Sequence, residues 1–152
     1  MKLNLQWAKP ISLKDGSKQN LIYTIDQNKL PQASGVYIFG RRFGNSIEAL
    51  YVGQALNIHS RVKGQLNNLA LMKAVQNSSI GKRVVITGQF MAGPGQQPKK
   101  CLSLIERSLI RNFLSSGHDL VNKQGTHLRR HEIISLSKLP KTFIPTSMFM
   151  DA

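Results

Sequence analysis

Short apolar runs rich in β-branched and aromatic residues predict strands in the first part of the chain. The runs 3–13 and 21–25 lie on either side of a turn at 14–16. Pro10 has no backbone N–H to donate, so it restricts the first run to a sheet edge or interrupts it. The pattern therefore predicts that the chain begins with strands, the first of which lies at an edge or is broken at Pro10.

A second pair of runs predicts an antiparallel hairpin. The segment 35–39 (GVYIF) and the segment 49–52 (ALYV) flank the stretch 40–46, whose glycine, asparagine and serine residues favour a turn. A further strand is predicted over 82–90. These segments supply the centre of the expected sheet.

Two segments change to a helical period. Apolar residues recur at the i, i+4, i+8 and i+11 spacing in the first helix, which starts after the N-cap candidate Asn57, and they are Ile58, Val62, Leu66 and Leu69. After the loop 93–98, a second helix is predicted over 99–114, with Gly117 as its C′ residue. The segment 131–138 is predicted to be a short strand or helical turn, and the tail after Pro140 has little pattern.

Length and composition limit the class of protein. A chain of 152 residues and 17.0 kDa, 41% hydrophobic and with a mean hydropathy of −0.21, is typical of one globular domain. No apolar run approaches the roughly 18 residues of a membrane helix, and the N-terminal residues lack the apolar region of a signal peptide. We therefore expect a soluble, cytoplasmic protein that does not bind membranes.

The charge is strongly unbalanced. Lys and Arg number 21 against 7 Asp and Glu, which gives a net charge of +14. Such an excess predicts a polyanionic partner, of which nucleic acid is the commonest. The alternative is a basic surface that only promotes solubility.

Other chemistries have little support in the residues. The single cysteine, Cys101, excludes an intramolecular disulfide and a cysteine-rich zinc site. His127 and His131 have i,i+4 spacing but make only half a zinc site. The Walker A pattern is absent, and seven scattered acids do not favour a multi-carboxylate centre with two metals.

Glu106 stands out on the second predicted helix because its neighbours on that face are largely apolar. A carboxylate that leans toward a core needs a cation, a metal or a hydrogen-bond donor. Alternatively, Glu106 lies at the edge of the apolar stripe and pairs with Arg111 or another surface base. Periodicity alone leaves both interpretations open.

An ordered set of motifs resembles the GIY-YIG nuclease superfamily over about residues 30–125. The set consists of Gly35-Val36-Tyr37, Tyr51-Val52-Gly53, Arg61, Glu106 and Asn122, and the segment 30–37 is similar to the lead-in of the excision-repair members. Thirteen residues separate the two tripeptides, which puts Arg41 and Arg42 at the predicted hairpin tip. Gln54 stands where many members have a lysine, and Gln65 stands where some have a histidine.

The resemblance implies an α/β fold with a small central antiparallel β-sheet flanked by helices, in one domain over 1–152. It implies a core at 30–125, an N-terminal β extension at 1–29 and a C-terminal extension at 126–152. The implied activity is hydrolysis of DNA phosphodiester bonds with one divalent ion, Mg²⁺ or Mn²⁺. The implied partner is duplex or branched DNA, on which the protein would act alone or as a homodimer.

The resemblance also implies a role for each site residue. Glu106 would hold the ion and Arg61 would bind the scissile phosphate with its planar fork. Tyr37 would act as general base or orient water, with its pKa lowered by a nearby cation. Tyr51 would position water or phosphate, Gly53 would allow a close backbone approach, and Asn122 would brace the site.

Each residue also has an ordinary structural interpretation. The tyrosines could be cross-strand aromatics in a hairpin, Arg61 a solvated helix residue and Asn122 a turn residue. Further contacts to nucleic acid are predicted from basic and polar residues outside the motif, namely Gln54, Arg41, Arg42, Lys63, Lys100, Arg107, Arg111 and Lys123. A catalytically silent nucleic-acid-binding module on the same fold, or a small RNA-binding or ribosome-associated protein, would carry the same charge.

Overall fold

The computed structural model describes residues 1–121, 130–136 and 138–151, and it shows a mixed α/β fold built on a mainly antiparallel sheet. The strand order in the main sheet is β1-β7-β5-β6, and β2 also pairs with β7. All of these pairings are antiparallel. The strands are β1 (Asn4–Trp7), β2 (Ile11–Ser12), β5 (Gly35–Phe43), β6 (Ser46–Ala55) and β7 (Lys82–Met91).

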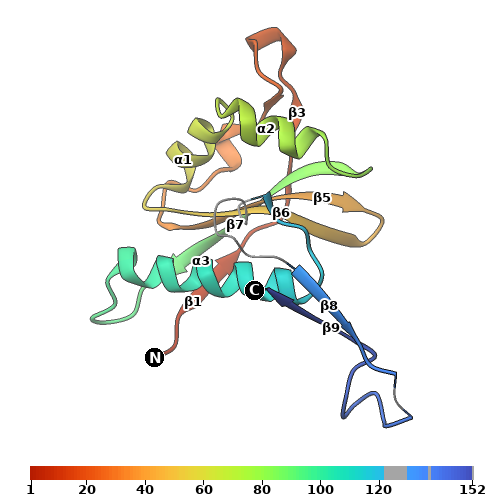
Figure 1. Cartoon of the computed structure of the whole chain (residues 1–152). Coiled ribbons are helices and arrows are strands. Elements are labelled where there is room, and N and C mark those ends of the chain that lie inside the picture. The colour runs from red at the N-terminus through yellow and green to blue at the C-terminus, as the bar shows by residue number, and fades with distance from the viewer. Residues whose placement is uncertain (122–129, 137, 152) are drawn as a thin grey trace.

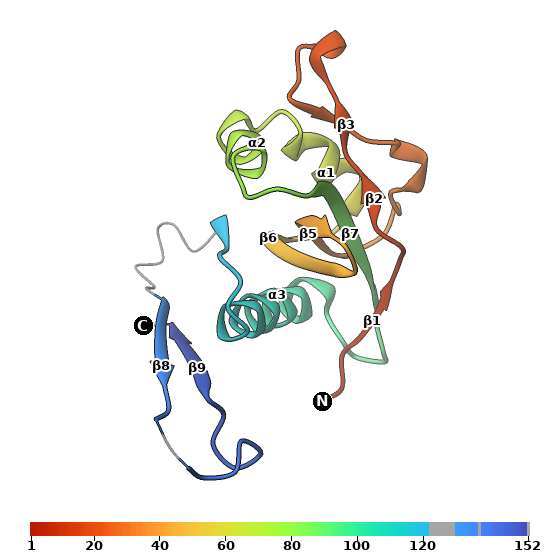
Figure 2. The ribbon, with the colours of Figure 1, turned by 90° about the vertical axis from the view of Figure 1, so that its right-hand side faces the viewer.

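Helices cover both faces of this sheet, as Figures 1 and 2 show. Helices α1 (Ile58–Gln65) and α2 (Leu69–Gln76) lie on one face, and the long α3 (Pro98–Ser115) lies on the other. Two small hairpins complete the fold and consist of β3 (Lys14–Asp15) with β4 (Tyr23–Thr24), and β8 (Arg130–Ile134) with β9 (Ser147–Asp151). Short 3₁₀ turns at Ser17–Gln19 and Gln27–Lys29 connect β3, β4 and β5.

Strand β5 is the centre of the core because helices bury both of its faces. Tyr37 and Phe39 pack into a cluster with α1 and α2, whereas Val36 and Ile38 pack into clusters with α3. All four side chains are at most 5% exposed. This explains why 35–39 has a continuous apolar run rather than the alternation of a half-buried strand.

Gly35 allows β5 to approach β7 closely. A Cβ atom at this position would lie 2.1 Å from the Gly88 carbonyl oxygen and 2.8 Å from Ile58 Cδ1. Gly88 in turn leaves room for the Trp7 indole, whose ring atoms would lie 3.0 Å from a Cβ there. The sheet therefore depends on glycine at the start of β5.

The prediction of one continuous first helix is wrong, because this segment forms two helices, α1 and α2. Helix α1 ends at Gln65, and Asn68 then takes an extended conformation (φ −80°, ψ 94°) and caps α2 through its side chain. Leu69 is consequently 58% exposed and does not continue the buried stripe of Ile58, Val62 and Leu66. The second predicted helix, the 82–90 strand and the role of Gly117 are confirmed, with Gly117 at φ +90° directly after the C-cap of α3.

The predicted hairpin turn at 40–46 is also wrong, because the strands continue through most of it. Strand β5 runs to Phe43, and the turn is reduced to Gly44 and Asn45. Arg41 and Arg42 therefore lie in the strand and not at its tip, opposite Glu48 and Ile47.

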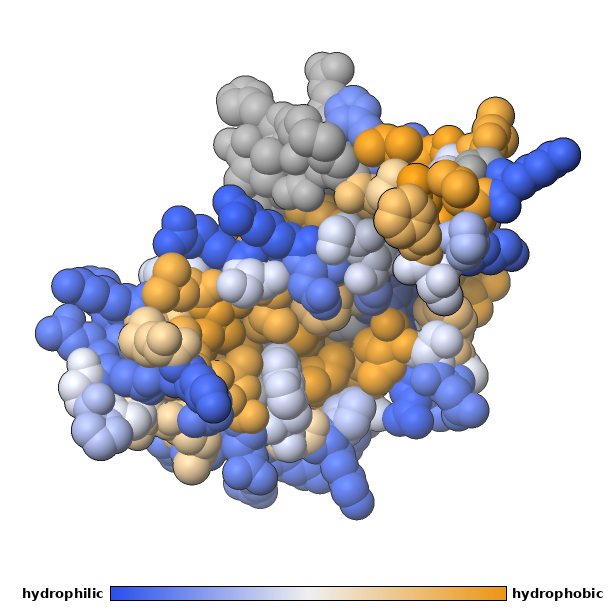
Figure 3. Space-filling view, turned by 90° about the horizontal axis from the view of Figure 1, so that it is seen from below, coloured by the Kyte–Doolittle hydropathy of each residue, from blue (hydrophilic) through white to orange (hydrophobic). Residues whose placement is uncertain are grey.

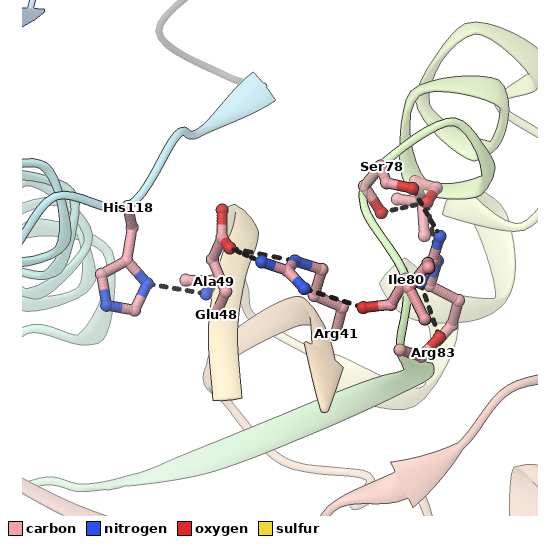
Figure 4. A network of polar contacts seen from close by, with 9 residues as sticks. Arg41, Glu48, Ala49, Ser78, Ile80, Arg83 and His118 are labelled. Atoms are coloured by element: carbon pink, nitrogen blue, oxygen red, sulfur yellow. Dashed lines mark hydrogen bonds and ion pairs between the residues drawn. The ribbon is translucent and has the colours of Figure 1, made fainter. Parts of the chain in front are cut away.

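Figure 4 shows that polar contacts hold this end of the sheet. Arg41 Nε donates to Glu48 Oε2 at 2.9 Å, and Arg41 Nη1 donates to the Ile80 carbonyl at 2.8 Å. Arg83 donates to four backbone carbonyls between Val75 and Gly81. His118 Nδ1 accepts the backbone N–H of Ala49, on the edge strand β6, at 2.8 Å.

Three further segments differ in detail from the prediction. The first run is interrupted between β1 and β2, as Pro10 predicts, and both parts join the main sheet through β7. Residues 14–15 are strand β3 rather than a turn. The tail after Pro140 contains β9, which pairs with β8 along its length.

The surface is not uniformly basic. Seen from below, apolar surface is bordered by hydrophilic side chains (Figure 3). Exposed apolar residues occur on α3 and in the C-terminal segment, among them Leu104, Ile134, Leu136 and Phe143. Within the described residues, no helix has the length and apolar character needed to cross a bilayer.

Two glycine-to-alanine changes test the close approach of the strands. Gly35→Ala should lower the free energy of unfolding by about 3 kcal/mol, because the new methyl group meets the backbone of β7. The control, Gly64→Ala in helix α1, has no atom within 4 Å of the new Cβ and should raise it by about 0.5–1 kcal/mol. Urea unfolding of both variants measures the difference, and equal stability of the two would contradict this account of the core.

Candidate active site

Tyr37 and Gly53 form the centre of the site, because they face each other on neighbouring strands. The register pairs Tyr37 with Gly53 and Phe39 with Tyr51. A Cβ at position 53 would lie 2.3 Å from the Tyr37 Cζ and Oη atoms. The Tyr37 ring thus occupies the space above Gly53, and the tripeptides of the two strands interlock. The predicted role of Gly53, a close backbone approach to the substrate, has a structural alternative here, since this glycine accommodates a tyrosine of its own chain.

Gln65 connects the two tyrosines. Its side chain is 6% exposed, and Nε2 donates to the Tyr37 hydroxyl at 2.8 Å and, more weakly, to the Tyr51 hydroxyl at 3.4 Å. The tyrosine rings are stacked with centroids 6.2 Å apart. Asn68 Nδ2 donates to Gln65 Oε1 at 3.3 Å. Both hydroxyls are therefore held by one buried amide.

Arg61 lies one turn before Gln65 on α1 and is exposed. It lines a shallow depression of about 440 Å³ where β6 passes into α1, together with Gln54, Ala55, Leu56, Asn57 and Ser60. Its guanidinium interacts with the Tyr37 hydroxyl by hydrogen bonding and by charge, and these contacts raise the pKa of Arg61. Arg61 is thus a permanent cation with a free approach from solvent.

Glu106 lies across the edge strand β6 from the tyrosines, on the α3 side of the sheet. Gln54 pairs with Val36 in the register, so its side chain also points toward α3. Gln54 Nε2 donates to Glu106 Oε2 at 2.6 Å and to Ser103 Oγ at 3.3 Å. The charges of Arg61 and Glu106 act on each other around the end of β6, the edge strand of the sheet.

Burial governs the protonation of both acidic groups. Burial raises the pKa of Tyr37 above 10.0, although the hydrogen bond from Gln65 and the charge of Arg61 act in the opposite direction. The expectation that a nearby cation lowers this pKa below its ordinary value is therefore wrong for the chain alone. Burial also raises the pKa of Glu106 above 4.5, against the Gln54 hydrogen bond and the charge of Arg61.

The structure brings four of the five predicted catalytic residues to one end of β6. Gln65 bonds to the hydroxyls of Tyr37 and Tyr51, and Arg61 interacts directly with the Tyr37 hydroxyl. Glu106 interacts electrostatically with Arg61. Asn122 lies outside the described residues, as does Lys123. The interpretation of Glu106 as a partner of Arg111 is not favoured, because its hydrogen bond comes from Gln54.

The predicted nucleic-acid contacts are spread over several surfaces. Lys100 and Arg107 line a shallow depression on α3 with Lys99, Ser103 and Leu104, and Arg111 is exposed on the same helix. Lys63 lines a separate cleft against the N-terminal segment, and Arg42 lines another with Lys82 and Ser12. Arg41 differs from these residues, since Glu48 and the Ile80 carbonyl already occupy its guanidinium.

Glu106 is the group at this site that suits a hard divalent cation. Its carboxylate is half-buried, and burial disfavours its negative charge, so a cation beside it would relieve that cost. Among the described residues, no three or more histidine, cysteine or acidic side chains lie close enough together to hold a metal ion. An ion here would thus have one protein carboxylate and a largely aqueous shell, which suits Mg²⁺.

The sequence analysis noted Gln65 only as a departure from the family and gave it no role, and it did not identify Asn68. Gln65 lies four residues after Arg61, a spacing that places both on one helix face and indicates a shared site. Asn68 could not be identified in this way, because its contact depends on the unexpected end of α1.

Compared with family models, with curated proteins and with solved structures, the chain has no match in any of the three. The resemblance described above thus rests on the motif residues alone.

The raised pKa of Glu106 predicts how stability depends on pH. The unfolded chain loses this proton at a lower pH than the folded chain, so the contribution of Glu106 is complete below about pH 4.5 and is lost as the pH rises through its folded pKa. Glu106→Gln should therefore be at least as stable as the wild type at pH 7. Thermal melts at pH 4 and pH 7 measure this, and a marked destabilisation at pH 7 would instead indicate a structural ion pair.

Proposed function

We propose that this protein is a metal-dependent DNA endonuclease of the GIY-YIG type. The observation that carries the proposal is a continuous set of interactions from Tyr51 through Gln65 and Tyr37 to Arg61 and Glu106. These residues come from four elements and are far apart in the sequence. Tyr37, Tyr51, Arg61 and Glu106 belong to the motif on which the resemblance depends, whereas Gln65 is a departure from it. The net charge of +14 supports a polyanionic substrate.

The reaction is hydrolysis of a phosphodiester. The oxygen of a water molecule forms a new bond to phosphorus, the bond to one ester oxygen breaks, and the proton of the water is transferred, directly or through solvent, to the leaving oxygen. Such a reaction depends on positioning and on offsetting negative charge in the transition state.

Arg61 is the phosphate-binding residue in this proposal. Its guanidinium is exposed, has no titration near neutral pH and can offer two parallel N–H donors to a phosphate. The depression that it lines is open enough for a phosphate group to enter from solvent. Its interaction with Tyr37 sets the direction of the guanidinium before the substrate arrives.

Glu106 would hold the divalent ion, with Gln54 orienting the carboxylate through the 2.6 Å hydrogen bond. When bound, Mg²⁺ or Mn²⁺ would supply polarisation of the phosphate and stabilisation of the leaving oxygen. The hydroxyls of Tyr37 and Tyr51 lie next to Arg61 and would orient water or phosphate there. The exposed bases of α3 would extend the contact along the backbone of duplex or branched DNA.

The first test removes the carboxylate. In a plasmid-nicking assay with Mg²⁺, Glu106→Gln should lower the rate by at least about 100-fold while leaving DNA affinity unchanged or tighter, since one negative charge is lost. Glu132→Gln is the matched control, because Glu132 is exposed on β8 and accepts only from Ser147 Oγ among the described residues. Wild-type protein that binds DNA and never nicks it, with either ion, would favour the catalytically silent module instead.

The second test separates the shape of Arg61 from its charge. Arg61→Lys keeps the positive charge and loses the planar fork, so we expect nicking to fall by about 100-fold with a small change in affinity. Arg61→Gln should lower both the nicking rate and the affinity. Turnover close to that of the wild type in Arg61→Lys would show that this arginine is a general electrostatic contact.

A further inference from the structure

The side-chain amides of Gln65 and Asn68 form a chain of hydrogen bonds whose direction can be worked out from one end. The backbone N–H of Leu71 can only donate, and Asn68 Oδ1 accepts from it at 3.1 Å. The atom that Asn68 presents to Gln65 is therefore the amide nitrogen Nδ2, which lies 3.3 Å from Gln65 Oε1. With Oε1 assigned, the atom of Gln65 that contacts the Tyr37 hydroxyl at 2.8 Å is the donor Nε2.

The direction of these hydrogen bonds determines to which groups the Tyr37 hydroxyl can donate. A phenolic oxygen has one hydrogen to donate and can accept hydrogen bonds. The two groups that form hydrogen bonds with Tyr37 Oη, the Gln65 amide nitrogen and the Arg61 guanidinium, have only donors to offer it. Within the part of the chain that the structure describes, no hydrogen bond has the Tyr37 hydroxyl as its donor, so its hydrogen is available to a further group.

We propose that Asn68 and Gln65 act as a hydrogen-bond relay that makes the Tyr37 oxygen an acceptor inside the site and directs its hydrogen outward, to a phosphate oxygen of the substrate. Tyr37 then orients the phosphate beside Arg61 and does not take the proton of the attacking water. Asn68 and Gln65 are positioning residues in this account, which rests on the proposed nuclease function and specifies the role of one residue in it.

The surroundings of Tyr37 agree with a neutral phenol. The ring is 1% exposed, and burial raises the pKa of its hydroxyl. The titratable and charged groups that act on it are Arg61 from α1 and Tyr51 from β6. Tyr51 raises the pKa of Tyr37, and Arg61 lowers it without outweighing burial.

Asn68→Asp reverses the relay with little change in shape. An aspartate caps a helix as well as an asparagine does, so the bond from the Leu71 N–H is kept. Its second oxygen can no longer donate to Gln65, and the Gln65 amide should turn so that Nε2 faces the new carboxylate and Oε1 faces Tyr37. The Tyr37 hydroxyl would then donate to Gln65 and lose its hydrogen for the substrate.

Asn67→Asp is the matched control. It introduces the same charge one residue earlier, on an exposed side chain whose contact is a 3.4 Å bond to the Lys63 carbonyl. Both variants are made in a Tyr23→Phe background, which leaves two of the three tyrosines, and ¹³Cζ-tyrosine NMR follows their ionisation. Circular dichroism at each pH verifies that the protein stays folded.

We expect the ionisation of Tyr37 to begin at a higher pH in Asn68→Asp than in Asn67→Asp, because a bond donated by the phenol stabilises its neutral form. Plasmid nicking should fall by about tenfold or more in Asn68→Asp and stay within about twofold of the wild type in Asn67→Asp. The melting temperatures should be equal.

Two results would overturn the relay, namely the same shift of the Tyr37 ionisation in both variants, or nicking by Asn68→Asp at the rate of Asn67→Asp. Wild-type protein that does not nick DNA would refute the proposed function, and the NMR comparison would still decide whether the relay exists.

Discussion

The structure depends on how Tyr37 fits into the central strand. Helices bury both faces of β5, and the tyrosine ring packs on the α1 side of the sheet, where it occupies the space above Gly53. The neighbouring strand therefore needs a glycine opposite the tyrosine. The same constraint directs the hydroxyl toward α1, where Gln65 and Arg61 meet it. The pairing of Tyr37 with Gly53 therefore serves both the packing of the sheet and the geometry of the site. For this reason the two tripeptides indicate the fold as well as the site.

Electrostatics at this end of β6 reflect a balance between burial and one exposed cation. Burial opposes the ionisation of both Tyr37 and Glu106, and the charge of Arg61 opposes burial at both groups without reversing it. The site is thus short of positive charge near Glu106, although the chain as a whole carries an excess of +14. In the proposed function a divalent cation at Glu106 would offset this cost of burial, and among the described residues the cation that lowers the pKa of this carboxyl is Arg61.

Local patterns predicted most strands and helices, because a continuous apolar run or a helical stripe depends on neighbours in the sequence. They failed where distant contacts decide the outcome. The sequence around Arg41 and Arg42 is typical of a turn. The strand continues through it because Arg41 bonds to Glu48 and to the Ile80 carbonyl, contacts that the local pattern does not reveal. Strand β9 has little pattern of its own and is defined by β8, its partner. The motif likewise predicted which residues gather at the site, but it could not predict the direction of their hydrogen bonds.

The division of the first predicted helix shows how a local rule can determine chemistry at a distance. Had α1 continued through Leu69, residue 68 would be an interior helix position with its backbone N–H bonded within the helix. Because α1 ends at Gln65, Asn68 becomes an N-cap, and the obligatory donor of Leu71 sets the orientation of its amide. That orientation passes through Gln65 to Tyr37. A cap is usually considered a matter of helix stability, worth about 1 kcal/mol. In the proposed relay, asparagine and aspartate are equivalent as caps at position 68 but differ in the direction that they give to the hydrogen of the buried tyrosine.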